Sequence, residues 1–385
     1  MQKFSTESVT KGHPDKVADQ ISDALLDAFL QKDPDAKIAI ETVVTKKTVI
    51  VLGEIKTNFA IDNEKIEFII QKTIKQIGYD KKEENFSYND LKIINLIHEQ
   101  SEEINKVVQK KGAGDQGVIF GYATDETPLF LPLSFYLTRN LSLKLTELRE
   151  KKILPFLRPD GKVQITFNYD NNNKKILSID SIIISSQHDK NIQLTKIKNE
   201  IIDKIIKKVI NKSLINEKTK FYINPSGKFT NGGPNADTGL TGRKIIQDAY
   251  GSEVRHGGGC FSGKDPSKID RCAAYMARYL AKNIVASGIC NKCEIQISYS
   301  IGIEKPVGLF INTFKTNKVS ENLIKEIIEK NFDLSPEGIK KKLNLTKPIF
   351  QITAREGHFG RNDDLFPWEN TNQKLLFQKL LQKNN

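Results

Sequence analysis

Residues 14–55, PDKVADQISDALLDAFLQKDPDAKIAIETVVTKKTVIVLGEI, contain a helix followed by a hairpin, and this order indicates the fold class. Pro14 is typical of the first position of a helix, and Pro34 is expected to lie beyond its end. Between them, apolar residues recur at four-residue spacing, at Val17, Ile21, Leu25 and Phe29. Residues 37–44 and 48–55 are rich in β-branched side chains and predict two strands around a short turn.

The same order of elements recurs along the chain. The next helix has Asp62 as its predicted N-cap and ends at Gly78. Further strands are predicted at 118–122, 163–169, 177–185, 294–303 and 307–314, with a turn at 170–173 and helices over 195–212, after Asp265-Pro266 and over 320–330. Strand pairs that alternate with helices indicate α+β modules, each a sheet covered on one face. We therefore expect three modules of similar order.

The composition of the 385 residues is that of a globular protein, with 38% hydrophobic and 28% charged residues. This length fits two or three domains. The first ten residues lack the apolar core of a signal peptide, and no run of about 18 apolar residues occurs. We therefore expect a cytoplasmic protein with no membrane partner.

Cys290 and Cys293 form a single CxxC pair among four cysteines. A structural zinc site needs four ligands, and no second pair stands at a matching spacing. Cys293 also opens the strand-like run 294–300. The pattern favours two packed thiols over a metal or redox site.

The net charge of +12 raises the question of a nucleic-acid partner. The lysines, however, are scattered among isoleucine and asparagine, as in residues 201–208, IIDKIIKK. An arginine-rich arm or a basic stripe with interleaved aromatic residues is not found. The charge therefore favours a small polyanionic substrate and no nucleic acid.

Two glycine-rich segments resemble nucleotide motifs without matching them. Residues 112–117, GAGDQG, fit the dinucleotide fingerprint, but a strand-like run follows where that motif requires a helix. The glycines still let the backbone approach a ligand, with Asp115 as a nearby carboxylate. Residues 258–264, GGCFSGK, fit the P-loop pattern, but Asp265 replaces the hydroxyl that would coordinate magnesium. Exposed backbone N–H groups and Lys264 nevertheless favour a phosphate or nucleotide role over a plain basic loop.

Residues 13–16, HPDK, open the first predicted helix. A carboxylate at Asp15 suits Mg²⁺, and an imidazole at His13 can donate to an oxygen of a leaving group. On their own, however, the two residues are better explained as a helix cap and a first-turn charge. The basic residues beside glycines at 157–162 and 239–244 are equally weak when taken singly.

Taken together, the motifs resemble those of a known enzyme family. Residues 12–16 (GHPDK), 112–117 (GAGDQG), 239–244 (GLTGRK) and 256–268 (HGGGCFSGKDPSK) resemble the S-adenosylmethionine synthetase (methionine adenosyltransferase) family. The resemblance runs from 4–9 (FSTESV) to 357–361 (GHFGR) and 366–369 (FPWE), which is nearly the whole chain. The second and fourth motifs are highly specific.

The resemblance implies an α+β fold of three similar sheet-plus-helix domains related by pseudo-threefold symmetry. We expect an N-terminal domain over 1–100, a central domain over 111–231 and a C-terminal domain over 232–385, with 101–110 as a mobile loop over the site. It also implies active sites between two subunits of a homo-oligomer, commonly a homotetramer built as a dimer of dimers.

The implied reaction joins ATP and L-methionine. The methionine sulfur attacks C5′ of ATP, and the released tripolyphosphate is hydrolysed to pyrophosphate and phosphate. Two Mg²⁺ and one K⁺ are the implied cofactors.

Roles are carried over motif by motif. The implied catalytic residues are His13, Lys162, Arg243, Lys244, Lys264 and Lys268. The implied ATP-binding residues are His13, Asp160, Lys162, Lys228, Phe229 (stacked on adenine), Asp237, Arg243, Lys244, Cys260 and Lys264. The implied methionine-binding residues are Glu54, Gln100, Asp237 and Lys268. The implied metal ligands are Asp15 and Asp270 for magnesium and Glu41 for potassium.

The chain departs from the family pattern near the nucleotide. Lys228 stands where arginine is general, and lysine lacks the bidentate fork of arginine. Thr230 and Asn231 replace hydrophobic residues, Ala236 replaces glycine, and Cys260 replaces alanine. The stretch after Gln100 is shorter than in typical bacterial members. These changes put nucleotide affinity and loop kinetics in doubt, but they remove no proposed catalytic charge.

Two alternatives belong to other classes. A nucleotide-binding protein without chemistry would have lost the metal carboxylates, yet Asp15, Asp237 and Asp270 are all present. An RNA-binding protein would need aromatic platforms or a recognisable module, and binding that weakens steeply with salt would support it.

Overall fold

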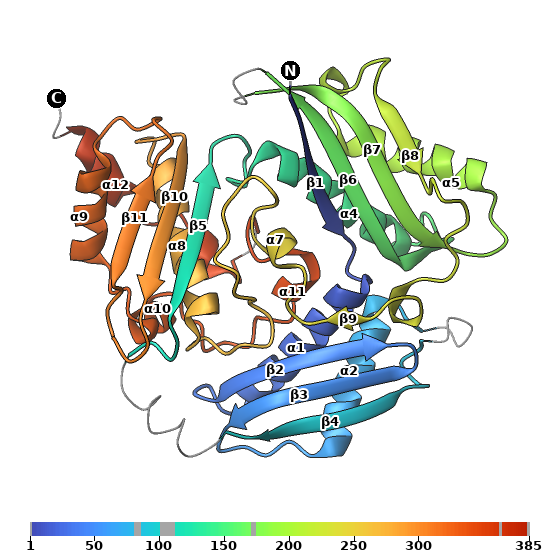
Figure 1. The fold of residues 1–385 in the computed structure, drawn as a ribbon, viewed down its shortest axis with the longest axis horizontal. Coiled ribbons are helices and arrows are strands. Elements are labelled where there is room, and N and C mark those ends of the chain that lie inside the picture. Colours follow the sequence, from blue (N-terminus) through green and yellow to red (C-terminus); the bar gives the residue numbers. More distant parts are fainter. Residues whose placement is uncertain (1, 81–85, 101–111, 171–174, 362–363, 383–385) are drawn as a thin grey trace.

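A computed structural model describes residues 2–80, 86–100, 112–170, 175–361 and 364–382. The loop expected at 101–110 and most of the turn expected at 170–173 lie outside these residues. Three sheets with their helices surround the middle of the molecule, where α7 and α11 lie (Figure 1). The α+β class and the three sheet-plus-helix domains are confirmed.

The strands form three sheets with one shared plan. The first sheet has the order β4-β3-β2-β9, the second β8-β7-β6-β1 and the third β11-β10-β5. In each, an antiparallel hairpin lies beside one further antiparallel strand, and in the first two a parallel strand follows on the other side. The strands are β1 Gln2–Val9, β2 Lys37–Thr45, β3 Thr48–Lys56, β4 Lys92–Glu99, β5 Gly117–Thr124, β6 Leu157–Tyr169, β7 Ile176–His188, β8 Lys220–Ile223, β9 Gly239–Leu240, β10 Lys292–Tyr299 and β11 Gly308–Asn312.

The sheets exchange strands in a cycle. Strand β1 precedes α1 of the first unit but pairs with β6 of the second. Strand β5 precedes α4 of the second unit but pairs with β10 of the third. Strand β9 precedes α8 of the third unit and pairs with β2 of the first. This cycle relates the three units by pseudo-threefold symmetry. Each sheet therefore contains one strand from a different part of the chain than its other strands.

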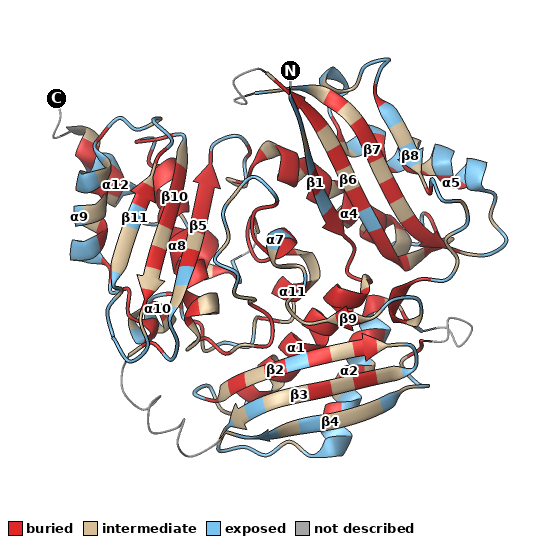
Figure 2. Cartoon of the chain, viewed as in Figure 1, coloured by how far each residue is buried: buried red, intermediate tan, exposed pale blue. Residues whose placement is uncertain are grey.

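One long helix packs on each sheet: α1 (Pro14–Leu30) on β2, α4 (Leu133–Glu150) on β6 and β1, and α8 (Ile269–Ala286) on β5 and β10. The other α-helices in the described part of the chain are α2 Asn63–Ile77, α5 Leu194–Ile201, α6 Lys207–Val209, α7 Ile245–Asp248, α9 Glu321–Asn331, α10 Pro336–Lys342, α11 Thr353–Glu356 and α12 Lys374–Gln382. Figure 2 shows α1 buried along nearly its whole length. The helix that carries His13 and Asp15 is therefore at the centre of the fold.

Several predicted elements have different bounds in the structure. The helix expected after Asp265-Pro266 begins only at Ile269, because Asp265 and Pro266 belong to a loop whose Asp265 accepts the amide of Ile38. The helix expected over 195–212 ends at Val209 and contains a π-helical turn at Ile202–Ile206. The strand expected over 294–303 ends at Tyr299. The caps at Asp62 and Gly78 are confirmed.

The described residues contain no helix long and apolar enough to cross a membrane. Cys290 and Cys293 are both free and buried, and the Cys290 side chain is hydrogen-bonded to Cys293. No group of three or more histidine, cysteine or acidic side chains with metal-binding geometry occurs among those residues.

Candidate active site

Four aspartates stand at four-residue spacing on one face of the buried helix α1, and each holds the backbone of a distant loop. Asp15 accepts the amide of Leu240 at 3.0 Å, and Asp19 accepts that of Gly242 at 2.8 Å. Asp23 accepts the amide of Gly263 at 2.8 Å, and Asp27 accepts those of Phe350 and Gln351 at 2.9–3.1 Å. We call these four residues the aspartate stripe. It brings the loops around 240 and 263, which carry predicted site residues, onto one helix.

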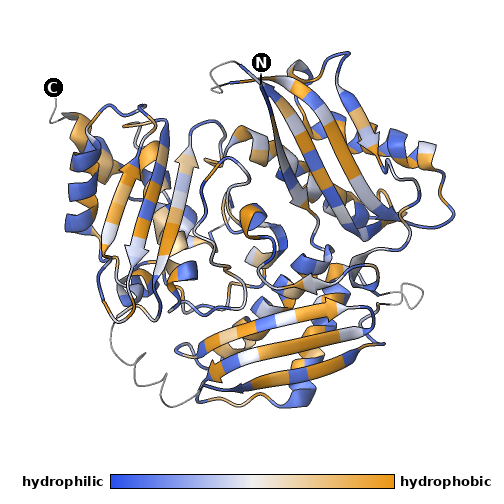
Figure 3. Cartoon of the chain, viewed as in Figure 1, coloured by the Kyte–Doolittle hydropathy of each residue, from blue (hydrophilic) through white to orange (hydrophobic). Residues whose placement is uncertain are grey.

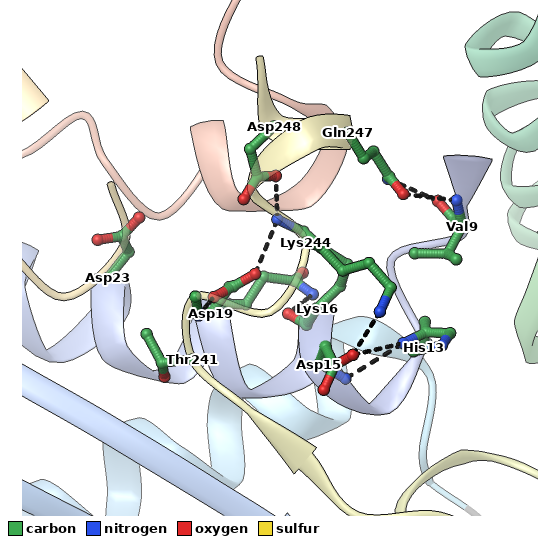
Figure 4. A network of polar contacts seen from close by, with 12 residues as sticks. Val9, His13, Asp15, Lys16, Asp19, Asp23, Thr241, Lys244, Gln247 and Asp248 are labelled. Carbon is green, nitrogen blue, oxygen red and sulfur yellow. Dashed lines mark hydrogen bonds and ion pairs between the residues drawn. The ribbon is translucent and has the colours of Figure 1, made fainter. Parts of the chain in front are cut away.

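The first group of site residues lies at the N-terminus of α1 (Figure 4). His13 is the N-cap, and its Nδ1 accepts the amide of Asp15 at 3.2 Å. Lys244 donates to Oδ2 of Asp15 at 2.5 Å, and Nε of Arg243 lies 3.6 Å from Oδ1. Because Nδ1 is an acceptor, the ring proton is on Nε2, which is free to serve as a donor to a ligand.

The electrostatics of this group fix its protonation. Burial, and next the positive charge of Lys244, lower the pKa of His13 to about 4. Burial opposes ionisation of Asp15, but Lys244 and the Leu240 amide hold its pKa below the ordinary value. At neutral pH, His13 is therefore a neutral imidazole beside a carboxylate and a lysine.

A buried network of charged residues lies next to His13, Asp15 and Lys244. Lys16 is fully buried and lies 3.0 Å from Asp19 and 2.5 Å from Asp248 (Figure 4). Burial alone would lower the pKa of Lys16, but the two carboxylates raise it above its ordinary value. Gln247, next to Asp248, exchanges two hydrogen bonds with the backbone of Val9. The network therefore ties the loop 240–248 to both α1 and the end of β1.

The predicted nucleotide residues of the central unit lie near this group. The charges of Lys162 and Asp237 both act on His13, and those of Asp237 and Lys244 act on Asp160. Asp160 accepts the amide of Gly233 at 2.8 Å, and burial raises its pKa to about 6. Lys162 pairs with Glu7 at 2.6 Å and is half exposed. We call His13, Asp15, Asp160, Lys162, Asp237, Arg243 and Lys244 the α1 cluster.

His188 holds the loop from Gly227 to Ala236 in position through two hydrogen bonds to Phe229. The amide of Phe229 donates to Nε2 of His188 at 3.0 Å, and the amide of His188 donates to the Phe229 carbonyl. Phe229 is half-buried and Lys228 is exposed. A half-buried aromatic ring beside an exposed cation is compatible with nucleotide binding, and this role of the two residues stays a prediction.

A second group comes from the glycine-rich loop and the start of α8. Lys264 donates to Asp270, and its side chain is hydrogen-bonded to Cys260. Burial raises the pKa of the Cys260 thiol, and the charges of Asp270 and Glu41 also act on it. Together with Lys268, which donates to Asp265, these residues form what we call the glycine-loop cluster: Glu41, Cys260, Lys264, Lys268 and Asp270.

Close packing requires glycine in the loop, because a side chain there would meet neighbouring backbone. Gly263 has φ = 80°, and a Cβ there would lie 1.9 Å from the Ile40 carbonyl oxygen. Below the loop, the fully buried Arg271 makes two hydrogen bonds to Asp23 at 2.7 and 2.8 Å. The aspartate stripe thus holds both clusters.

The predicted methionine residues Glu54 and Gln100 lie at adjacent strand ends. The Gln100 amide donates to the carbonyl of Ile55, next to Glu54, at 2.9 Å. Glu54 stands opposite Ala39, which bridges to Lys264 on its other side. Glu41 and Glu54 are exposed and alternate with the buried residues Ile40 and Val51, so they project from the sheet face away from α1.

The donor set suits a cation held together with a substrate. Asp15 and Asp270 each contribute one carboxylate and each is paired with a lysine. Mg²⁺ commonly binds through one or two carboxylates plus substrate phosphates. The chemistry of these residues therefore fits magnesium bound with a polyphosphate.

Sequence reasoning missed the residues that position the site. Asp19, Asp23, Asp27 and Asp248 had no predicted role. The signal was present, because aspartates at 15, 19, 23 and 27 fall on one face of a helix whose other face is apolar. A stripe of four carboxylates on a buried helix indicates backbone amides or cations opposite it.

Comparison with known proteins agrees with this arrangement. Three family models match in sequence: the S-adenosylmethionine synthetase N-terminal domain over 1–102, the central domain over 110–229 and the C-terminal domain over 231–370. Proteins named S-adenosylmethionine synthase from two strains of Staphylococcus epidermidis are 49% identical over 381 residues. The alignments cover 95% of this chain and 94% of each relative.

Proposed function

The chain belongs to the S-adenosylmethionine synthetase family, and we propose that it forms S-adenosylmethionine from ATP and L-methionine. The observation that carries the proposal is the meeting of His13, Asp15 and Lys244 at one helix end, with the charge of Lys162 acting on His13. Three segments far apart in sequence, the start of α1, the loop before α7 and strand β6, supply this mixture of cations, carboxylate and neutral imidazole. Such a mixture suits a polyphosphate.

In the proposed first step, the methionine sulfur attacks C5′ of ATP. The S–C5′ bond forms, the C5′–O bond breaks, and the electron pair leaves with tripolyphosphate. Methionine sulfur has no proton to lose, so no general base is required. The barrier lies in the departure of a highly charged group, which positioning and charge stabilisation lower.

The residues of the chain have separate roles in that step. The Nε2 proton of the neutral His13 donates to the leaving oxygen. Lys162, Arg243, Lys244 and Lys264 neutralise the phosphate oxygens. Phe229 stacks on adenine, and Asp160, Lys228 and Cys260 complete the nucleotide contacts. Glu54, Gln100, Asp237 and Lys268 hold methionine, with Asp237 shared between the two substrates.

In the proposed second step, the same cationic residues act on the released tripolyphosphate. Water attacks a terminal phosphorus, a phosphoanhydride bond breaks, and pyrophosphate and phosphate form. The basic residues need not move between the steps, because the charge to be stabilised stays on the same chain of phosphates.

Metal ions are part of the proposal. Asp15 and Asp270 would each hold one Mg²⁺ together with phosphate oxygens, and Glu41 would hold K⁺. Bound magnesium would supply neutralisation of the charge that develops on the leaving group.

We also propose that two copies of the chain complete each site. Glu54 and Glu41 project from an open sheet face that also carries exposed apolar residues, among them Leu96 at 57% exposure. The third sheet carries exposed apolar residues of the same kind, Val118 on β5 and Phe310 on β11. Figure 3 shows that strands β2, β3 and β4 carry many hydrophobic residues. Apolar faces of this kind mark protein contacts, and two copies joined through them would cover the methionine residues. A dimer of two such dimers is the proposed assembly.

The test is mass spectrometry of the purified protein with ATP, methionine, Mg²⁺ and K⁺, with each component omitted in turn. The proposal predicts S-adenosylmethionine with pyrophosphate and phosphate, all dependent on methionine and magnesium. Binding of ATP without any of these products, in folded and oligomeric protein, would contradict it and would favour a binding-only member.

A further inference from the structure

A polar cavity of about 450 Å³ lies outside both clusters, where the three units meet. It is formed by Lys11 before α1, Gln20 on α1, Thr73 and Gln76 on α2, Glu150 at the end of α4, and Gln351, Ile352 and Arg355 at α11. We call it the Lys11 cavity. Of the eight described residues that line it, Ile352 alone is apolar, so the cavity is suited to a polar ligand.

Two cations face this cavity. The Lys11 side chain is only 5% exposed. Its ammonium group donates to the carbonyl of Gln76 at 3.1 Å and to the carboxylate of Glu150. The guanidinium of Arg355 is half-buried, and within the described part of the chain no ion pair or hydrogen bond of this group is found. An arginine with five donors at the wall of a polar cavity, beside a buried ammonium, is an arrangement that an oxyanion satisfies.

The charges of the cavity are not balanced. Lys11 and Arg355 supply two positive charges, Arg149 lies next to the cavity, and Glu150 is the one carboxylate in the described lining. Burial, and next the charge of Arg355, lower the pKa of Lys11 to about 8, so the ammonium is largely protonated at pH 7. Repulsion between two like charges in a shared cavity is relieved when an anion binds between them.

Glu150 competes with such an anion. It is paired with Lys11, but its side chain is 40% exposed, so water can solvate this carboxylate when an anion takes its place beside Lys11. The volume of the cavity exceeds that of one phosphate group, which leaves room for an organic substituent. Amide groups of Gln76 and Gln351 at the wall can serve as further hydrogen-bond donors.

We propose that the Lys11 cavity is a binding site for a phosphate-type oxyanion, free phosphate or a phosphomonoester, with Lys11 and Arg355 as its two positive groups. The site is separate from the proposed reaction and holds whether or not the proposed function is correct. It lies close to the reacting groups in sequence, because Lys11 is two residues before His13. The Lys11 carbonyl accepts from Gln20 at 2.7 Å, and the Gly12 carbonyl accepts from Tyr79 at 2.6 Å.

The test is equilibrium dialysis with radiolabelled orthophosphate, with methionine absent and the nucleotide site filled by an ATP analogue with a β,γ-imido bridge. The proposal predicts saturable binding of about one phosphate per chain. Arg355→Gln should weaken this binding at least about tenfold, because it removes a charged donor. Glu150→Gln should tighten it severalfold, because it removes the competing carboxylate. A second arm with glycerol 3-phosphate identifies the source, since tighter binding than phosphate indicates a phosphomonoester and weaker binding indicates free phosphate.

The control is Lys207→Gln, which removes an exposed ion pair on α6 and should leave phosphate binding unchanged. Absence of saturable binding up to roughly 10 mM, or equal binding by wild type and Arg355→Gln, would overturn the proposal and leave Lys11 and Glu150 as an internal ion pair. If the analogue itself fails to bind, the proposed function is weakened, but the comparison of Arg355→Gln with wild type still decides the question of the cavity.

Discussion

The α1 cluster and the glycine-loop cluster are held by the same helix but differ in how far the chain encloses them. At the centre of the α1 cluster, the side chains of Asp15, His13 and Lys244 are 3%, 17% and 19% exposed, and its outer members Lys162 and Arg243 are 47% and 55% exposed. In the glycine-loop cluster, Lys264 and Lys268 are 23% and 31% exposed, and Glu41 lies on an open sheet face. The α1 cluster therefore has a buried centre, where burial fixes the protonation of His13, whereas Lys264, Lys268 and Asp270 of the glycine-loop cluster are all partly exposed.

This difference shows what one chain can arrange by itself. Buried carboxylates can hold loops in place because each accepts amides and cations that would otherwise be unsatisfied. An exposed cluster of charges has no such constraint on its outer side. The glycine-loop cluster therefore fits a site that is completed by another surface, and the α1 cluster fits the part that is preorganised.

The largest expected effect is on stability. Asp19→Ala would leave the fully buried Lys16 with only Asp248 and would release the Gly242 amide. We expect the free energy of unfolding to fall by about 3–5 kcal/mol, as for other broken buried ion pairs. Urea unfolding measures this. Asp203→Ala, which breaks an exposed pair with Lys207, is the control and should change it by less than about 0.5 kcal/mol. Similar losses in both variants would show that the network behind the α1 cluster does not stabilise the fold.

The next effect is on catalysis. Lys162→Ala and His13→Asn should fold normally and lose about 10²–10³ in kcat, because each removes one contact to the leaving polyphosphate. Steady-state rates of S-adenosylmethionine formation measure this, with Lys204→Ala on the surface as the control. A near-wild-type kcat in either variant would exclude that residue from the mechanism.

A smaller effect concerns the open face. Leu96→Asp should shift the assembly toward smaller species, because a charge is then desolvated in the contact between copies. Sedimentation velocity over a range of protein concentrations measures the shift. Leu375→Asp on α12 is equally exposed but lies away from the sheets, and it should leave the assembly unchanged. Unchanged sedimentation of Leu96→Asp would rule out this face as the contact.

A modest gain in affinity for ATP is expected from a substitution at Lys228. Lys228→Arg restores a bidentate fork at an exposed position and should lower the Kd for ATP by about two- to tenfold without changing kcat. Isothermal titration of ATP into both proteins measures it. Weaker binding by the arginine variant would show that the loop 228–236 is adapted to lysine.

The last expected effect is a pH dependence of stability. The pKa of His13 is about 4 in the folded protein, below its ordinary value, so the unfolded chain binds more protons between about pH 4 and 6.5. His13 therefore makes the folded state more stable as pH rises through this window. The stability difference between wild type and His13→Asn should increase from pH 4 to 6.5, as measured by urea unfolding. Comparison with the variant is needed because Asp160, whose pKa is raised to about 6, acts in the opposite direction. A difference that stays constant with pH would contradict the burial of a neutral imidazole.

The sequence predicts some features well because they depend on local rules. The helix that begins at Pro14, the strands on both sides of Thr45–Thr48, and the caps at Asp62 and Gly78 follow from periodicity and capping. The exchange of β1, β5 and β9 does not, because pairing between distant strands leaves no local signal. Strand β9 is only two residues long and is fixed by its contact with β2.

The candidate site shows the same division. The motif residues were identified from glycine-rich patterns and a family resemblance, and the structure brings most of them into two groups. Their positioning by Asp19, Asp23 and Asp248 depends on amides and cations more than 200 residues away in sequence. A periodic set of aspartates signals that partners exist but does not identify them.

The most direct test of the account asks whether the two clusters of one chain serve different sites. Lys162→Ala and Lys264→Gln chains, each inactive alone, are expressed together so that they pair at random, and S-adenosylmethionine formation is measured. If each site combines the α1 cluster of one copy with the glycine-loop cluster of another, half of the pairs regain one intact site. The co-expressed protein should then reach about a quarter of the wild-type rate. A rate no higher than that of the separate variants would contradict it and would place both clusters of one chain in a single site.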